Sequence, residues 1–516
     1  MRNNVVKKVL AATLACMMTF SMTTVAQAKG DKKSDKEITI GVTSFADTLE
    51  PTEQYFSWVV SRYAIGECLT KFDENGEIVP CLAEEWENSE DGKTWTFKIR
   101  EGVKFSNGDD MTPDMVKASI ERTAEKSDRV PEFFDLDSIE VDGQNLIFHL
   151  NRANANMAGC LADPLFLIVD TNVDDSTFAM EGPICTGPYA VESFSPTDSC
   201  VVVKNENYWD GAPEIKSITV KNIGSDTKVD AMLSGDIDLA QGPDATALNR
   251  VENNDDINIV KVTGTRENDF ELNCREGNPL SDKNLRLALS YAVDRDVVAQ
   301  VAGNGYSSPI STAFPPSVGY DSEDVNGQVY DLDKAKECLE AAGYSDSDGD
   351  GIVDKDGENL SLTISIANGS STAVSETLQD MWKQIGVDVQ IEMLENVSDK
   401  RASGDFDMLV SPNWQTVNAG DGQKYLMNRW SDGGSDNYSG YHSDEFQSVL
   451  DKLDAAFTQE DRVSAFVEAQ QILADDAPAI WMYANDNVTL VNSKLENVTV
   501  FPIDYYLVTN KWTLAE

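Results

Sequence analysis

Histidine is almost absent from this chain: only His149 and His442 occur among its 516 residues. Neither belongs to a His-Glu-x-x-His zinc motif, and the chain has no Gly-x-Ser-x-Gly nucleophile elbow and no Gly-x-x-x-x-Gly-Lys phosphate loop. The sequence therefore argues against zinc catalysis and Ser-His hydrolysis. A catalytic carboxylate pair, as in a secreted glycosidase, stays open because 89 acidic residues make chance pairs inevitable.

Basic residues are also scarce: 41 lysines and arginines face 89 aspartates and glutamates, giving a formal net charge of −48 at pH 7. Such a surface repels nucleic acid and anionic membrane faces, so neither is expected as a partner. The acids are scattered along the chain, which is typical of a solubilising surface outside the cell. At 516 residues the chain exceeds what one hydrophobic core usually organises, so we expect two or more domains.

Long apolar runs are missing beyond the N-terminus, where three features together predict an export signal. They are a basic start, an apolar run and a small-x-small cleavage site: Arg2, Lys7 and Lys8; Val9 to Met22; and Ala26-Gln27-Ala28. The mature chain is expected to begin near Lys29, and no later segment approaches the roughly 20 apolar residues that a spanning helix needs. We therefore predict an exported, soluble protein, periplasmic or at the cell surface.

A lipid anchor on Cys16 is the less favoured alternative. Thr13-Leu14-Ala15-Cys16 lacks the leucine expected three residues before the cysteine, and apolar Met17-Met18 follows it in place of a polar tether.

Paired cysteine motifs are absent as well. Without Cys16 an odd number of cysteines remains, and none has the Cys-x-x-Cys spacing of a metal or redox site. They are interpreted mainly as small buried hydrophobes, although one disulfide stays open: Cys68, Cys81, Cys160, Cys185, Cys200, Cys274 and Cys338.

The most informative stretch is residues 81–122. Trp95, Phe97 and Ile99 alternate with polar residues, which predicts a half-buried strand between two turns. Thr112 then predicts a helix N-cap, with Pro113 at the first helical position. This order of elements predicts a small α+β unit.

The second half of the chain has a different pattern. Ser281 is predicted to cap a helix whose apolar residues recur with helical spacing from Leu285 to Val297. Alternating strands at 360–366 and 387–393 flank a helix at about 374–386, which predicts a βαβ unit with parallel strands. Amphipathic helices at about 445–456 and 459–474 and a buried strand at 479–483 are predicted to follow.

Several of these segments together resemble family 5 of the extracytoplasmic solute-binding proteins, the peptide- and nickel-type receptors of ABC importers. The resemblance is carried by Leu82-Ala83-Glu84-x-Trp86, Asp91-Gly92-Lys93, Phe97-x-x-Arg100-x-Gly102-Val103-x-Phe105-x-x-Gly108, Thr112, Val116 and Ser119, and by collinear blocks at 182–240, 281–305 and 445–485. Met115 and Cys185 depart from the family pattern, which has Asp and Gly there.

This resemblance implies an α/β, two-lobed periplasmic-binding-protein-like fold of class II, in which lobes hinge around a ligand without altering it chemically. The implied partners are a small solute and the permease subunits in the membrane, and we expect a monomer. The predicted parts are a signal peptide (1–28), a charged tether (29–36), lobe I (37–66, 181–265 and 486–516), an extra subdomain within lobe I (67–180) and lobe II (266–485).

Two loops and the crossing between the lobes are expected to line the cleft. The loop after Leu49-Glu50-Pro51 and the loop after the strand 406–410 supply most of the predicted site, and Trp414 matches the family's cleft tryptophan. Arg266, near the crossing, is expected to hold a carboxylate. The predicted ligand-binding residues are Gln54, Tyr55, Trp58, Arg266, Asn413, Trp414, Asn418 and Asp421. The alternative is that the aromatics only fill the core and that Arg266 pairs with a surface acid.

The ligand is expected to be a short peptide or peptide-like solute. Peptide-type relatives hold the ligand's amino terminus with an Asp three residues after the cleft tryptophan, but that position is Val417, and Asp421 substitutes only if the loop is displaced. Nickel-type relatives use a histidine in the same loop, which this chain lacks. A chelated nickel ion or a sugar oligomer stays open.

An acidic loop resembles a calcium-binding EF-hand loop. Carboxylates occupy positions 1, 3, 5 and 9, with Gly351 at position 6, but Gly357 replaces the bidentate Glu at position 12. The predicted ligands of a structural calcium ion are Asp346, Asp348, Asp350 and Asp354. The alternative is a turn that only ties a helix to a strand; no other cofactor is expected.

Overall fold

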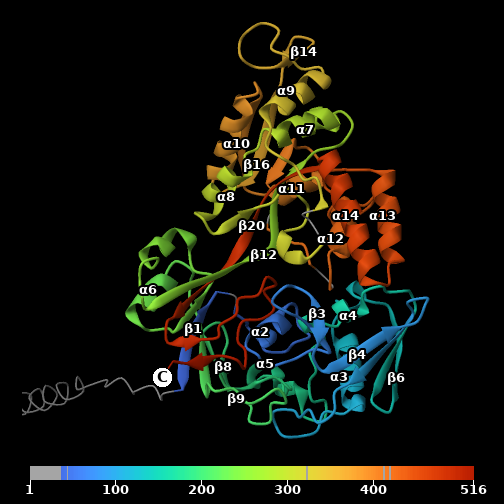
Figure 1. The fold of residues 1–516 in the computed structure, drawn as a ribbon, viewed down its shortest axis with the longest axis vertical. Helices are drawn as coiled ribbons and strands as arrows, with labels where there is room; N and C mark the ends of the chain where they lie inside the picture. Colours follow the sequence, from blue (N-terminus) through green and yellow to red (C-terminus); the bar gives the residue numbers. More distant parts are fainter. Residues whose placement is uncertain (1–35, 44, 321–323, 411–412, 418–419, 516) are drawn as a thin grey trace, which may run out of the picture.

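The structure is a computed structural model that describes residues 36–43, 45–320, 324–410, 413–417 and 420–515. The predicted signal peptide, Cys16 and the site residue Asn418 lie outside these ranges. Figure 1 shows the two lobes stacked along the long axis, with lobe I and its subdomain below and lobe II above. Within the described ranges, every helix is too short or too polar to span a bilayer.

Lobe I contains the N-terminal strand of the described chain and the strands that follow the subdomain. Its strands are β1 (Glu37–Val42), β8 (Tyr189–Ser195), β9 (Ser199–Lys204), β10 (Ser217–Asn222) and β11 (Leu239–Gln241). Its helices are α2 (Phe56–Arg62), η3 (Asp175–Thr177), α5 (Phe178–Glu181), α6 (Lys228–Ser234) and η4 (Ala245–Arg250). The C-terminal segment, with β21 (Leu495–Glu496) and β22 (Thr513–Leu514), buries Trp512 in the core of this lobe.

The subdomain is a four-stranded antiparallel sheet of order β4-β5-β7-β6 with a helix packed against it. As predicted, Trp95, Phe97 and Ile99 face the core, and the Thr112 hydroxyl accepts a hydrogen bond from Met115 N at 3.3 Å. Its strands are β2 (Thr70–Phe72), β3 (Ile78–Pro80), β4 (Ala83–Asn88), β5 (Thr94–Ile99), β6 (Leu136–Asp142) and β7 (Asn145–Leu150). Its helices are α3 (Pro113–Lys126), η1 (Val130–Glu132), α4 (Met157–Cys160) and η2 (Pro164–Phe166).

Lobe II contains the predicted βαβ unit: β16 (Ser361–Ala367), α10 (Ala373–Lys383) and β17 (Asp388–Leu394), with the two strands parallel. Its other strands are β13 (Ser307–Pro309), β14 (Asp354–Lys355), β15 (Glu358–Asn359), β18 (Met408–Val410) and β19 (Trp414–Gln415). Its other helices are η5 (Pro279–Ser281), α7 (Lys283–Tyr291), α8 (Arg295–Gly303), η6 (Pro316–Val318), α9 (Leu332–Ala341), α11 (Val397–Ser403), α12 (Gln423–Trp430), α13 (Asp444–Asp454) and α14 (Gln459–Asp476).

The helix predicted from Ser281 to Val297 is wrong in two respects. Ser281 ends η5, and Asp282 is the N-cap of α7, where it accepts a hydrogen bond from Asn284 N at 2.8 Å. The helix then stops after Tyr291, and Asp294 caps a second helix, α8. An aspartate side chain that binds the amides of the next turn favours a new helix start over continuation.

A single twelve-stranded sheet runs through both lobes in the order β17-β16-β18-β12-β20-β11-β1-β10-β9-β8, with β13 beside β20 and β19 beside β12. The strands β12 (Ile257–Leu272) and β20 (Ala479–Asn492) lie antiparallel at its centre and pass from one lobe to the other (Figure 1). Their register shifts between Thr263 and Glu267. At this bulge only a glycine fits, because a Cβ on Gly264 would lie 2.8 Å from the Asn485 carbonyl oxygen.

Among the described residues, no disulfide joins any of the seven cysteines from Cys68 to Cys338. Five of them are buried, which agrees with their interpretation as small hydrophobes.

Candidate ligand-binding cleft

Strand directions place the carboxyl ends of both parallel sheets at the crossing between the lobes. β12 runs from lobe I to lobe II and β20 runs back. In lobe I, β11 is antiparallel to β20 and parallel to β1, so both point towards lobe II. In lobe II, β18 is antiparallel to β12 and parallel to β16, so both point towards lobe I. Ligands of open α/β sheets bind at such carboxyl ends.

The lobe I side of the cleft is lined by an aromatic row. The rings of Tyr55 and Trp58 meet edge to face with centroids 5.0 Å apart, and Trp58 lies 5.2 Å from Tyr505. Tyr55 is 53% exposed, which is unusual for a large side chain in contact with other rings. Gln54 precedes it with a φ of +48° and presents its carbonyl to the cleft side of the loop. Of the three rings only Tyr55 is exposed; Trp58 is half-buried and Tyr505 is buried. An exposed tyrosine ring suits a ligand with apolar or planar groups.

This aromatic loop is anchored by a buried ion pair. The Glu50 carboxylate accepts hydrogen bonds from Arg122 Nη2 at 2.7 Å and from Thr52 N at 3.1 Å. Burial alone would raise the pKa of Glu50, but the bonds from Arg122 and Thr52 hold it below its usual value. Glu50 therefore stays charged at neutral pH and fixes the loop to the subdomain.

Arg129, which sequence reasoning did not single out, contacts the predicted loop at Gln54 and Tyr55. Its guanidinium carbon lies 4.0 Å from the centroid of the Tyr55 ring, and its Nη1 donates to the Gln54 carbonyl at 2.9 Å. Its Nε makes no hydrogen bond within the described residues. Arg129 lies in an irregular segment between α3 and η1, where no periodicity signals which side chains converge.

Arg266 lies at the bulge of the crossing, as the sequence suggested. Its Nη2 is 3.8 Å from an Asp504 carboxylate oxygen, and its Nη1 donates weakly to the Asn413 carbonyl at 3.4 Å. Asp504 is held more firmly by Arg62, whose Nη2 is 2.8 Å away. Arg62 and Asp504 also line a cavity of about 210 Å³ at the carboxyl ends of β1 and β11. The alternative was that Arg266 only pairs with a surface acid. Its separation from Asp504 is at the limit of ion-pair distance, so such a pairing is weak.

Trp414 approaches the same cleft from lobe II. It is half-buried on β19, which pairs with β12 at Arg266 and Glu267. Trp414 and Trp58 both pack against the same hydrophobic cluster. Asn413 lies beside them, and its side-chain oxygen accepts a hydrogen bond from Asn485 at 3.0 Å.

A buried charge cluster lies behind Trp414. The Arg429 guanidinium is 4.8 Å from the Trp414 ring centroid, 3.0 Å from a Glu267 oxygen and within hydrogen-bond distance of Asp269 at 2.6 Å. Burial raises the pKa of Glu267 well above its usual value and also raises that of Glu271. Burial alone would lower the pKa of Arg429, but Asp269 and its neighbours raise it. The Arg429 cation therefore lies beside two buried glutamates, Glu267 and Glu271, whose pKa values are raised.

The prediction that Asp421 substitutes for the family's ligand-binding aspartate is not supported by its position. Its carboxylate is bound by Arg462 Nε at 3.0 Å and accepts from Gln423 N at 2.9 Å. Val417, in the family's aspartate position, is 5% exposed and packs in the hydrophobic cluster. Neither residue is available to an ammonium group in the cleft, because one is paired and the other is apolar.

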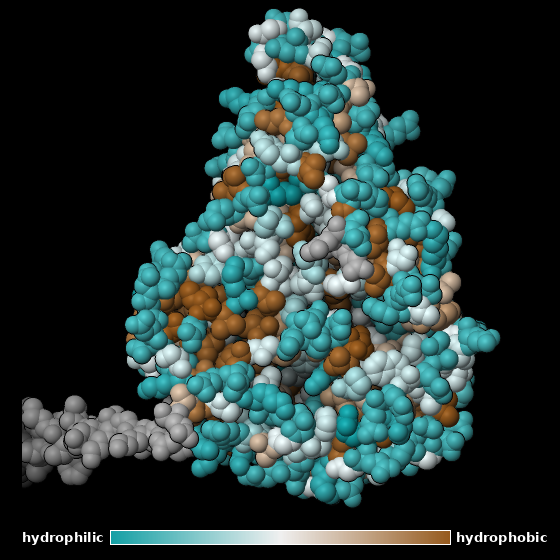
Figure 2. Space-filling view, in the orientation of Figure 1, coloured by the Kyte–Doolittle hydropathy of each residue, from teal (hydrophilic) through white to brown (hydrophobic). Residues whose placement is uncertain are grey.

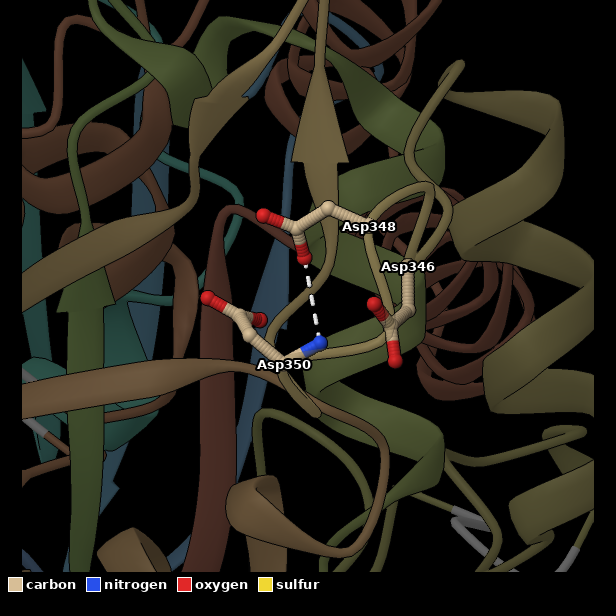
Figure 3. A group of neighbouring side chains, drawn as sticks. All are labelled: Asp346, Asp348 and Asp350. Carbon is tan, nitrogen blue, oxygen red and sulfur yellow. Dashed lines mark hydrogen bonds between the residues drawn. The ribbon is translucent and has the colours of Figure 1, made fainter.

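The predicted calcium loop brings three of its four carboxylates together. Ligand oxygens of Asp346, Asp348 and Asp350 all lie within 4.8 Å of one another, and Figure 3 shows the three side chains around one turn. Asp354 is directed elsewhere: it accepts from Ser347 N and Ser347 Oγ at 2.8 and 2.9 Å. Oxygen ligands grouped in this way suit a hard divalent cation.

Both histidines lie away from the cleft. His149 is on β7 of the subdomain, 3.7 Å from Glu140, and His442 is an exposed residue beside Asp432 at 2.8 Å.

On the face shown in Figure 2, apolar side chains gather in the recess beside the crossing strands, and the surrounding surface is mostly hydrophilic.

Two α/β lobes, two crossing strands and a cleft lined by aromatics and arginines define a two-lobed solute-binding protein. The sequence profile of the bacterial extracellular solute-binding proteins, family 5, matches residues 77–437, and the chain belongs to that family. It is therefore a non-catalytic solute-binding receptor of an ABC importer, as its resemblance to the family implied.

Individual relatives differ in the solute they are named for. The chain is 30% identical to the nickel-binding periplasmic protein of Escherichia coli K12, over 67% of this chain and 70% of the relative. It is 27% identical to the oligopeptide-binding protein AppA of Bacillus subtilis 168, over 87% and 86% of the two chains. Among solved structures, a nickel ABC transporter protein from Bacillus halodurans has a TM-score of 0.84 at 27% identity, covering 93% of this chain and all of that one.

Proposed function

We propose that the captured solute is a short peptide or a peptide-like compound with a carboxylate group. The observation that carries this proposal is the set of arginines at the cleft. The Arg129 guanidinium lies on the Tyr55 ring and is within 4.0 Å of its centroid, and Arg266 is 3.8 Å from an Asp504 carboxylate oxygen. A guanidinium binds a carboxylate with two parallel hydrogen bonds, and such a pair gains strength as closing lobes exclude water.

One of the relatives is named for a peptide ligand. AppA is named as an oligopeptide-binding protein and aligns over most of this chain. The proposed receptor captures its solute outside the cytoplasmic membrane and passes it to permease subunits, and the predicted export signal fits that location.

A chelated nickel ion is the second candidate, because two sequence relatives and three solved structures are named for nickel or contain a nickel complex. The two histidines of this chain lie outside the cleft, so the chelator would have to supply the nitrogen ligands. Native mass spectrometry of the purified mature chain distinguishes the candidates. A retained peptide mass would support the proposal, whereas a retained nickel complex or sugar would contradict it.

Replacing Trp414 by alanine is expected to weaken solute binding by roughly 30-fold or more, because truncating an aromatic anchor commonly costs about 2 kcal/mol or more. Folding should be little affected, since Trp414 is only half-buried on a two-residue strand. Calorimetry with the solute identified by mass spectrometry measures the change. Trp414→Phe is the matched control and should retain most of the affinity; equal affinity in the alanine variant would remove Trp414 from the site.

We also propose that Asp346, Asp348 and Asp350 bind a structural calcium ion, with the Asp354 carboxylate supporting the loop through Ser347. A ligand that binds only the folded state stabilises it by mass action, so millimolar calcium should raise the melting temperature of chelator-treated protein by several degrees. The Asp348→Asn variant should lose this response. An unchanged melting temperature with calcium would contradict the proposal.

A further inference from the structure

Two arginines and one aspartate form a charge group where the lobes cross. Arg62 Nη2 donates to a carboxylate oxygen of Asp504, Oδ2, at 2.8 Å, and Arg62 Nε donates to the Asp504 carbonyl at 2.6 Å. Arg266 Nη2 approaches the same Oδ2 atom, but only to 3.8 Å. Asp504 is therefore committed to Arg62, and the two arginines share one acid.

The places of the two arginines in the fold explain this difference. Arg62 is the last residue of α2, and its carbonyl accepts a hydrogen bond from Val508 N, so α2 and the C-terminal segment lie side by side (Figure 1). The Arg62 side chain is 7% exposed. Arg266 comes from β12, its side chain is 31% exposed, and its hydrogen bond to the Asn413 carbonyl is long, at 3.4 Å. Arg62 is thus a fixed group, whereas the Arg266 guanidinium keeps donors available.

Positive charge is in surplus around the cavity of about 210 Å³ beside this group. The Lys228 ammonium donates to Thr43 Oγ1 and to two backbone carbonyls of the cavity wall, and no carboxylate of the described residues pairs with it. Burial lowers the pKa of Lys228 to about 8, so it is still mostly charged at pH 7. Asp486, another acid of the wall, is paired with Lys261 at 2.7 Å. Such a surplus of cations suits an anionic group of the solute.

We propose that Arg62 is a positioning residue of the binding cleft: by holding Asp504, it keeps the Arg266 guanidinium open for a carboxylate of the solute. The solute then supplies the acid that Arg266 lacks and binds it with two parallel hydrogen bonds. Arg62 acts through Asp504 and needs no contact with the solute. Its role towards the solute rests on the proposed function, in which the solute carries a carboxylate.

Loss of the Arg62 charge should let Asp504 move to Arg266. The Asp504 side chain is 27% exposed and its Oδ2 atom already lies 3.8 Å from Arg266, so a small rotation brings the two into contact. A largely buried carboxylate that has lost its partner gains by finding another cation. Arg62→Gln should therefore occupy Arg266, and adding Asp504→Asn should free it again, because a neutral amide binds a guanidinium weakly. A merely structural role of Arg62 predicts no such rescue.

Modification of arginines by phenylglyoxal, mapped by mass spectrometry of peptides, tests this role on the mature chain without any solute. Phenylglyoxal attacks the neutral guanidine, and a carboxylate partner stabilises the charged form, so Arg266 should react at least about threefold more slowly in Arg62→Gln. Adding Asp504→Asn should restore the parent rate. Arg62→Lys, which keeps the charge but not the two-point contact, should slow the reaction less. Arg152, which is 80% exposed, is the internal reference and should react equally in all variants.

Calorimetry with trialanine and trialanine amide tests the link to the solute. The parent chain should bind trialanine at least about tenfold more tightly than the amide, and Arg62→Gln should lose most of this preference.

Two results would overturn the inference. They are an unchanged rate at Arg266 in both Arg62→Gln and Arg62→Lys, and no recovery of a slowed rate when Asp504→Asn is added. The Lys variant keeps the test decisive where the Gln variant does not fold. Equal binding of the two peptides, or binding of neither, together with the expected rates at Arg266 would contradict the proposed function alone, and the control of Arg266 by Arg62 would stand.

Discussion

Replacing Gly420 by alanine should separate lobe II from the subdomain and weaken solute binding by at least about tenfold. The new Cβ would lie 2.2 Å from the Gly159 carbonyl carbon and 2.5 Å from Cys160 N. Both are backbone atoms, so no side chain can move away to make room. The solute binds best when the two lobes are close together, and the variant populates that closed conformation less. The apparent affinity for the solute therefore falls in proportion to the population of the closed conformation.

The measurement combines small-angle scattering with calorimetry on the loaded and empty protein. Gly420→Ala should show a larger radius of gyration in the presence of solute than the parent chain. Gly433→Ala is the matched control, because Gly433 also has a positive φ, +71° against +93°, but its Cβ would meet nothing within 4 Å. Both variants share the backbone cost of about 1 kcal/mol for a side chain in this region. Equal affinity and equal dimensions in the two variants would show that the contact is dispensable.

The fold was largely predictable because its strongest signals are local. Alternation at Trp95, Phe97 and Ile99 and the cap at Thr112 identified the subdomain unit, and the βαβ pattern identified the parallel strands of lobe II. The predictions failed where two local signals compete. The apolar spacing from Leu285 to Val297 continues through residues 292–294, but the Asp294 side chain accepts from Val297 N at 3.3 Å and starts a new helix.

The site was less predictable because its partners are distant in sequence. Asp421 was assigned to the ligand, yet its partner Arg462 lies 41 positions later on a helix that spacing alone cannot orient towards it. Arg129 was missed because it reaches Tyr55 from the subdomain, 75 positions away from the Gln54 carbonyl that it binds. Trp414 was assigned to the site only because the family resemblance marks it. Contacts of this kind follow from the packing of lobes, which no periodicity encodes.

Replacing Arg429 by methionine is expected to lower the free energy of unfolding by about 3–5 kcal/mol at pH 7, the usual cost of removing one partner from a buried ion pair. The side chain is 1% exposed, and its loss leaves Glu267 and Asp269 buried without their cation, while Glu271 keeps only Arg401, at 3.5 Å. Adding Glu267→Gln and Asp269→Asn should recover much of this loss, because neutral amides carry no uncompensated charge. Chemical denaturation with a two-state fit measures each value.

The same cluster predicts the sign of the pH dependence. Burial already raises the pKa of Glu267 and Glu271, and removing the positive charge of Arg429 raises these pKa values further. Between pH 4.5 and 7 the folded variant then binds more protons than the unfolded chain, so its stability falls as pH rises and recovers as pH is lowered towards 5. Arg250→Met, at an exposed pair with Asp230, is the control and should change stability by less than about 0.5 kcal/mol at either pH. Two results would contradict this prediction: a stability loss below about 1 kcal/mol in Arg429→Met, or a loss that is independent of pH. Either result would mean that apolar packing alone, without a charged cluster, supports Trp414.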